Sequence, residues 1–376
     1  MLIHLCSTRF CYRGLLILNL LFCFFNPCQA APEGNAVVRG KAGDSEIVIT
    51  TTNRLAGAIH SLTWNGKEFI DSFDHGRQLQ SAASFDCGQP DEFWAERFNP
   101  TEAGSRSDGV GPTSSSKLLR LQARDNELHS TTQMAFWLAP GQKSSGRPAL
   151  NTSILSKHQI SKQVRIGYQG LDQVLDYRVT FTIPQGERHN HAQFEALTGY
   201  MPAEFEQFWK FNPQTGKLLP LDDGPGEQND PVILSTRDGK YAMGVFSPAQ
   251  PSPGYQHAGY GRFRFPAAKV VKWNCVFRVK NPGGVAAGDY SFQVLVAVGT
   301  LEDVRSSLKS LAKENTKEEL KRSFNSILPK QASECSPARR FRIPLRLKQV
   351  HQFSPVKIRP AELLPGLLLK HRMRIS

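Results

Sequence analysis

Short runs in which apolar and polar residues alternate fill the chain from about residue 35 to residue 300. In the segment 174–183 (VLDYRVTFTI), the apolar positions 177, 179, 181 and 183 alternate with polar positions. Successive side chains of a strand point to opposite faces, so this pattern predicts a strand with one buried face. Further runs with strand character are 46–51, 57–64, 117–122, 163–168, 231–235 and 290–298.

Turn signals separate these runs. Asn65-Gly66 is a strong two-residue hairpin signal, and Asp238-Gly239, just before the run 241–246, is a second. Many short strands without helical periods between them favour an antiparallel sandwich over a parallel α/β sheet. We therefore predict a mainly β protein, built as one large antiparallel β-sandwich with long polar insertions at 99–116 and 141–156.

The pattern becomes helical after residue 300. Thr300 with Asp303, and Thr316 with Glu319, each show the spacing of a capping box. Apolar residues follow at 304, 308 and 311, and again at 320, 324 and 327, which are helical spacings. We expect two short helices that pack on the sheet and end a domain spanning 31–328.

The first thirty residues have the parts of a secretory signal. Arg9 and Arg13 precede an apolar run at 15–25, and small residues near Ala30 suit a signal peptidase. That run is too short to cross a bilayer, which needs roughly 20 residues as a helix. We predict a signal peptide at 1–30, a secreted or periplasmic protein and no stable membrane span after cleavage. An uncleaved signal anchor is the alternative.

The charge distribution argues against a nucleic-acid partner. The chain carries a net charge of +13, but +9 of this lies in 330–376 and +2 in the first thirty residues, which leaves only +2 on the body. A nucleic-acid footprint should lie on the folded domain. Five prolines in 330–376 exclude long helices there, so we predict a disordered basic tail over 329–376; translation of a shifted or non-coding frame is the alternative. In the body, Cys87 and Cys275 are the two cysteines that a disulfide could join.

The densest mixture of polar and aromatic residues lies at 71–111. Such a loop can present acid–base groups together with an aromatic platform, which is the combination that sugars need. The alternative is that these charged residues tie a long loop to itself. The candidates in this stretch are His75, Arg77, Trp94, Glu102 and Arg106.

A second candidate stretch lies at 187–209. His189 and His191 are two residues apart, so on one strand they would share a face and could move a proton or bind a metal. The third ligand of a metal would be Glu187, Glu195 or Glu204. Histidine pairs at this spacing are common by chance, so we predict no metal and no cofactor. The aromatic residues of this stretch, Tyr200 and Trp209 among them, would line a cleft or belong to the core.

A third candidate stretch lies at 255–264 and contains His257, Tyr260 and Arg262. No Asp or Glu occurs between Gly239 and Gly288. A cleft edge built from this segment would be cationic and would favour carboxylated or sulfated ligands. The alternative is a basic strand that faces solvent.

Two stretches, 57–80 (GAIHSLTWNGKEFIDSFDHGRQLQ) and 290–311 (YSFQVLVAVGTLEDVRSSLKSL), resemble galactose-mutarotase-like supersandwich proteins, and the resemblance covers roughly 37–325. It implies a carbohydrate-active protein: an aldose epimerase, a polysaccharide lyase accessory sandwich or a sugar-binding relative. Mutarotases pair a mid-chain histidine, as acid, with a late glutamate, as base. Arg77 and either His189 or His191 match this pattern loosely, but the stretch without acidic residues lies where the late glutamate should be.

Three functional hypotheses follow, each for a monomer with a carbohydrate ligand. The first is an exported carbohydrate-processing enzyme that uses general acid–base chemistry, with Arg77 and His191 in the cleft and Trp94 or Trp209 stacking on the sugar. The second is a non-catalytic carbohydrate-binding module. The third is a polysaccharide lyase acting on uronate polymers, with His257 or Tyr260 as base and Arg262 neutralising the uronate.

Overall fold

The computed structural model describes residues 32–89 and 93–327, so the predicted signal peptide and basic tail lie outside the described residues. The described part is mainly β, and all of its strand pairings are antiparallel. This confirms the predicted fold class.

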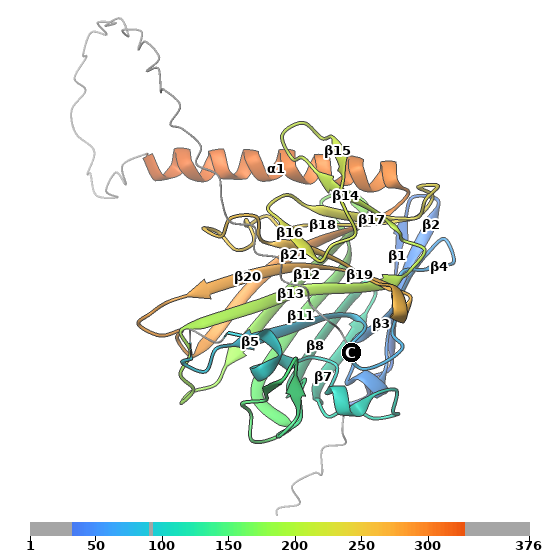
Figure 1. The fold of residues 1–376 in the computed structure, drawn as a ribbon. Helices are drawn as coiled ribbons and strands as arrows, with labels where there is room; N and C mark the ends of the chain where they lie inside the picture. Colours follow the sequence, from blue (N-terminus) through green and yellow to red (C-terminus); the bar gives the residue numbers. More distant parts are fainter. Residues whose placement is uncertain (1–31, 90–92, 328–376) are drawn as a thin grey trace, which may run out of the picture.

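Hydrogen bonding arranges most strands in two series (Figure 1). The first series runs β7 (Lys117–Arg124), β8 (Glu127–Phe136), β11 (Leu155–Tyr168), β12 (Leu171–Ile183), β21 (Gly288–Gly299), β18 (Ala242–Phe246), β17 (Val232–Ser235), β14 (Gln207–Phe211) and β15 (Leu218–Pro220). The second runs β1 (Ala36–Ala42), β2 (Ser45–Thr51), β3 (Ile59–Trp64), β5 (Leu79–Phe85), β13 (His191–Pro202), β20 (Val270–Lys280), β19 (Tyr260–Phe265) and β16 (Gly226–Gln228).

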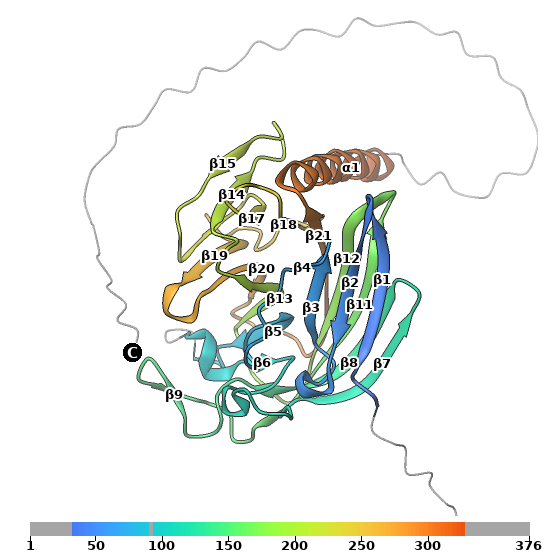
Figure 2. The same cartoon turned by 90° about the vertical axis from the view of Figure 1, so that its right-hand side faces the viewer.

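Short strands complete the arrangement. The strand β6 (Pro100–Thr101) pairs with both β5 and β8 and so links the two series, while β4 (Lys67–Glu68) pairs with the end of β3 as a short hairpin. A separate hairpin is formed by β9 (Lys143–Ser144) and β10 (Arg147–Pro148). Figure 2 shows β1 beside β11, with β19 and β20 on the opposite side of the molecule.

The main core lies between the two series and takes side chains from both. On β12, Tyr177, Val179, Phe181 and Ile183 are all buried, and the intervening side chains are more exposed, as the alternation predicts. The hairpin predicted at Asn65-Gly66 is also confirmed. Both residues have positive φ, 49° and 72°, as a type I′ turn requires.

The two predicted C-terminal helices are in fact one continuous helix, α1 (Leu301–Ile327). Its beginning is the predicted capping box, in which Asp303 N donates to Thr300 Oγ1 and Thr300 N donates to Asp303 Oδ2. Thr316 lies inside the helix, where its hydroxyl donates to Ala312 O one turn earlier. The prediction of a second start was therefore wrong, because a hydroxyl three residues before an acid is also compatible with a helix interior.

The first half of α1 packs on β12, β18 and β21 through Val304, Leu308 and Leu311. The approach is close at Gly244 of β18, where an added Cβ would lie 2.6 Å from Val304 Cγ1. Within the described residues, no helix combines the length and apolarity that a membrane crossing needs. Cys87 and Cys275 are both free thiols.

Candidate functional site

A cavity of about 380 Å³ lies on β5, β13 and β20, on the face turned away from the main core. Its volume falls within the range of roughly 300–1,000 Å³ that is typical of small-molecule sites. It is lined by Asp74, Gly76, Arg77, Gln80, Ala82, Ser84, Ala95, Glu96, Asn99, Thr101, Trp137, Glu195, Thr198, Tyr200, Phe265, Ala268, Val270 and Lys272.

Strand alternation explains the polar lining. On β5, Gln80, Ala82 and Ser84 face the cavity, whereas Ala83 and Phe85 belong to the core. On β13 the register against both neighbouring strands shifts just after Glu195. Such a bulge adds one residue to the strand. It therefore lets Glu195 and Thr198, three residues apart, reach the same face.

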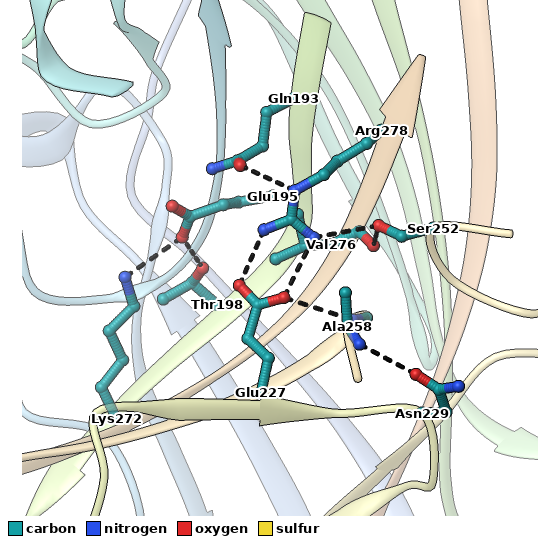
Figure 3. Close-up of polar contacts among 11 residues, drawn as sticks. Gln193, Glu195, Thr198, Glu227, Asn229, Ser252, Ala258, Lys272, Val276 and Arg278 are labelled. Atoms are coloured by element: carbon teal, nitrogen blue, oxygen red, sulfur yellow. Dashed lines mark hydrogen bonds and ion pairs between the residues drawn. The ribbon is translucent and has the colours of Figure 1, made fainter. Parts of the chain in front are cut away.

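Two of the lining residues, Glu195 and Lys272, form an ion pair (Figure 3). Lys272 Nζ lies 3.1 Å from Glu195 Oε2, and Thr198 Oγ1 donates to the same oxygen at 2.7 Å. Burial by itself would raise the pKa of Glu195, but the Lys272 charge and the hydrogen bonds outweigh it and lower the pKa below its ordinary value. Burial would lower the pKa of Lys272, and Glu195 reverses this and raises it. Both groups are therefore charged at neutral pH.

A second polar cluster, centred on Arg278, lies next to this ion pair along β13 and β20 (Figure 3). The Arg278 guanidinium donates to both carboxylate oxygens of Glu227, at 2.7 and 3.0 Å. It also donates to Gln193 Oε1 at 3.0 Å and to Ser252 Oγ at 3.1 Å. Because every one of these donors has a partner, the Arg278 cluster holds β13, β16 and β20 together and offers little free hydrogen-bonding capacity.

Arg77 reaches the cavity from the loop before β5. Its Nε donates to Asp74 Oδ2 at 3.1 Å, and its guanidinium lies 5.1 Å from the centre of the Phe73 ring. Arg77 thus ties its loop together, as the alternative interpretation of this stretch predicts, and still lines the cavity. Gln80 has a free hydrogen-bond acceptor, because its buried Oε1 has no partner among the described residues.

Of the residues singled out from the sequence, Arg77, Glu195 and Tyr200 line the cavity. The two histidines expected to share a face have different surroundings. β13 begins only at His191, so strand alternation does not extend to His189. His191 packs on Phe93, with ring centres 4.2 Å apart, and burial lowers its pKa. His189 is buried against Phe85 and lies 2.9 Å from Glu187 Oε2.

The other candidates of the 71–111 loop brace the structure. Both ring nitrogens of buried His75 lie within 2.9 Å of backbone carbonyl oxygens. Glu102 is fully buried and pairs with Lys162, and Arg106 is exposed and donates to Lys143 O.

Neither tryptophan candidate is among the residues that line the cavity. Trp94 Nε1 donates to Ser144 Oγ, and the ring stacks with the Arg147 guanidinium at 4.7 Å. Trp209 packs in the cluster beneath α1, where its Nε1 donates to Ser235 Oγ.

The 255–264 segment does not form a cationic edge of this cavity. His257 is exposed, whereas Tyr260 is buried and its hydroxyl accepts a hydrogen bond from Ser247 N. Burial raises the pKa of Tyr260. Arg262 donates to Asp222 Oδ1 at 2.5 Å, so an acid from another segment neutralises its charge.

Sequence reasoning did not single out Lys272, which lines the cavity, and considered Glu195 only as a metal ligand. A signal for Lys272 is present in the segment 270–280 (VVKWNCVFRVK), where polar residues at 272, 274, 278 and 280 alternate with buried apolar ones. The Glu195–Thr198 spacing carries no such signal, because it needs the bulge to bring both side chains to one face.

No family model matches this chain, and no curated protein matches it. Solved structures to which this chain is similar include the Slr1438 protein from Synechocystis sp. PCC 6803, with 11% identity, a TM-score of 0.38 and coverage of 72% of this chain and 98% of that one. A galactose mutarotase-like protein from Lactobacillus casei has 9% identity, a TM-score of 0.37 and coverage of 70% and 100%. A glycosyl hydrolase family 38 protein from Enterococcus faecalis has 11% identity, a TM-score of 0.41 and coverage of 73% and 32%.

Proposed function

We propose that the cavity on β5, β13 and β20 binds a carbohydrate and that this protein is a carbohydrate-binding protein. The observation that carries the proposal is the combination of aromatic and directional polar groups around one cavity of about 380 Å³. Tyr200, Trp137 and Phe265 offer apolar ring surfaces to the C–H faces of a sugar. Gln80 and Asn99 can form directional hydrogen bonds with its hydroxyls.

The ion pair suits a ligand rich in hydroxyls. A hydroxyl both donates and accepts hydrogen bonds, so neighbouring hydroxyls can donate to Glu195 and accept from Lys272 at the same time. Hydrogen bonds to charged groups are about twice as strong as neutral ones. The free acceptor Gln80 Oε1 adds a further position for a ligand hydroxyl.

The protonation states favour binding over epimerase chemistry. Efficient general acid–base catalysis needs groups whose pKa lies near the working pH. Here the pKa of Glu195 is lowered, and the pKa values of Lys272 and Tyr200 are raised. No histidine is among the described residues that line the cavity.

Carbohydrate processing is the second candidate function. Glu195 is ionised across the neutral range, because its pKa is lowered, so the carboxylate is available as a proton acceptor. Turnover would then require a proton donor other than Lys272, because the raised pKa of Lys272 makes it a weak acid.

A glycan array tests the proposal, followed by titration calorimetry with the best ligand. Glu195→Gln and Tyr200→Ala should each weaken binding by at least about tenfold, which corresponds to loss of one charged hydrogen bond or one aromatic contact. Arg178→Met, an exposed arginine on β12 outside the lining, is the control and should bind like the wild type. Absence of any bound glycan, or wild-type affinity in both cavity variants, would contradict the proposal. Nuclear magnetic resonance of the sugar incubated with the protein separates binding from processing, since only an enzyme converts the sugar into a product.

We further propose that the protein is exported, on the basis of the N-terminal signal pattern. N-terminal sequencing of the protein secreted by its host should give a chain that begins at residue 31. Recovery of the protein only inside the cell, as a chain that still begins at Met1, would contradict this.

A further inference from the structure

Three side chains that can ligate a metal converge behind β5, on the core side of the strand. They are His158 of β11 and the pair Glu187 and His189 from the connection between β12 and β13. His158 Nε2 lies 2.8 Å and His189 Nε2 lies 2.9 Å from the same oxygen, Glu187 Oε2. The ligating atoms of all three residues lie within 4.8 Å of one another.

The cluster is enclosed by aromatic rings. Only 3% of the His158 side chain and 2% of the His189 side chain are exposed, against 24% for Glu187. The Phe85 ring lies against both imidazoles, with ring centres 4.8 and 4.6 Å away. Such an apolar shell limits access of solvent and strengthens electrostatic interactions inside it.

Hydrogen bonds from other segments hold the connection that carries Glu187 and His189. Val285 N donates to His189 O at 2.7 Å, and Asn190 N donates to Asp86 Oδ1 at 2.9 Å. His158 is fixed separately, on the long strand β11. The three side chains are thus placed by the fold itself, and a bound ion would meet a site whose ligands already converge.

Two imidazole nitrogens and one carboxylate oxygen form a ligand set that zinc uses in proteins. Ligands about 2.0–2.1 Å from a tetrahedral ion lie about 3.3 Å from one another. The two nitrogen–oxygen distances of 2.8 and 2.9 Å therefore need to widen by only a few tenths of an ångström. We propose that His158, Glu187 and His189 bind a divalent transition-metal ion of the zinc class. This departs from the sequence-based expectation of no metal.

A second cavity gives the cluster an opening. Its volume is about 450 Å³, and its lining includes Glu187, His189 and Cys87. It shares no lining residue with the proposed carbohydrate cavity. Three protein ligands with an open fourth position is the arrangement in which a metal ion keeps a water molecule or a small ligand. The metal site is thus separate from the proposed function and can be tested alone.

The test uses the full chain, stripped with a chelator and titrated with Co²⁺ and Zn²⁺. We expect visible Co²⁺ absorption bands typical of four or five ligands, and displacement of Co²⁺ by Zn²⁺ but not by Mg²⁺ or Ca²⁺, which prefer oxygen ligands. His158→Ala, His189→Ala and Glu187→Gln should each weaken Zn²⁺ binding by roughly 100-fold or more, since loss of an outer-shell partner alone costs about 10–100-fold.

His191→Ala is the matched control, because it removes a histidine two residues from His189 that packs on Phe93 instead. It should bind Zn²⁺ like the wild type. Glu187→Gln removes the charge of the carboxylate but keeps an acceptor for a histidine N–H, so the cluster can still form hydrogen bonds without a metal. Circular dichroism checks that each variant is folded. All variants retain the histidines at 4, 351 and 371, so Zn²⁺ binding that is unchanged in Glu187→Gln would place the ion elsewhere and overturn the proposal. Equal loss of affinity in His191→Ala would overturn it as well.

Discussion

Lys272 Nζ on β20 lies 3.1 Å from Glu195 Oε2 on β13, although the two residues are 77 positions apart in the chain. The direct partner of Lys272 on β13 is Tyr200, so the lysine side chain reaches along the sheet to the carboxylate. The Lys272 charge and the hydrogen bond from Thr198 keep Glu195 ionised inside a cavity where burial alone would favour its neutral form.

This relationship predicts how stability depends on pH. The folded pKa of Glu195 lies below its ordinary value of 4.5, so its contribution to stability is present above about pH 4.5. The contribution is lost as the pH falls through the lowered folded pKa, because the unfolded state then binds the proton more readily. Glu195→Gln should therefore flatten the decline of the unfolding free energy below pH 4.5, measured by urea denaturation. Glu46→Gln, which alters a carboxylate that is half exposed, is the control; an unchanged acid slope in Glu195→Gln would contradict the prediction.

The buried pair Glu102–Lys162 should be costly to break. Lys162 Nζ contacts Glu102 Oε1, and the two side chains are 1% and 0% exposed. Removing one partner leaves an uncompensated buried charge, so Lys162→Met should lower the unfolding free energy by about 3–5 kcal/mol. The double variant Glu102→Gln with Lys162→Met should recover part of this loss. Lys67→Met breaks the more exposed pair with Glu204 and should cost at most about 1 kcal/mol. Equal costs for the two lysines in urea denaturation would refute the prediction.

Arg77 should matter to ligand binding through the shape of its guanidinium. It contacts Asp74 and the backbone oxygen of Ala268 at the same time, which an ammonium group cannot reproduce. Arg77→Lys keeps the charge but should weaken binding of the glycan found in the array by about tenfold, measured by calorimetry. Arg165→Lys, in an exposed pair with Glu127, is the comparison and should leave the affinity unchanged. Full affinity in Arg77→Lys would show that only its charge matters.

The helix α1 should stabilise the fold mainly through its first half. Leu308 is fully buried on the face of α1 that packs on the sheet, whereas Leu320 is 56% exposed. Leu308→Ala should lower the unfolding free energy by about 2–5 kcal/mol. Leu320→Ala should change it by less than about 0.5 kcal/mol. Comparable losses in thermal or urea unfolding for the two leucines would mean that the second half of the helix also packs on the protein.

Local patterns in the sequence predict most of the fold. The strand β12 and the hairpin at Asn65-Gly66 are found where alternation and turn chemistry place them, because both depend on neighbouring residues. The helix start at Thr300 is equally local. The error at Thr316 arose because the same spacing of a hydroxyl and an acid occurs inside helices.

The candidate sites depend on contacts that no local pattern contains. Arg77 and Tyr200 were identified from their sequence surroundings, but the Glu195–Lys272 pair requires a bulge and a pairing between distant strands. Likewise, the sequence suggests His189 and His191 as one pair, whereas the fold separates them and brings His158 of β11 to His189. The sequence by itself determined which segments are strands and which faces are apolar, since these follow from side-chain periodicity. Only the tertiary structure decided which polar residues meet, because strand register and bulges place side chains that lie far apart along the chain.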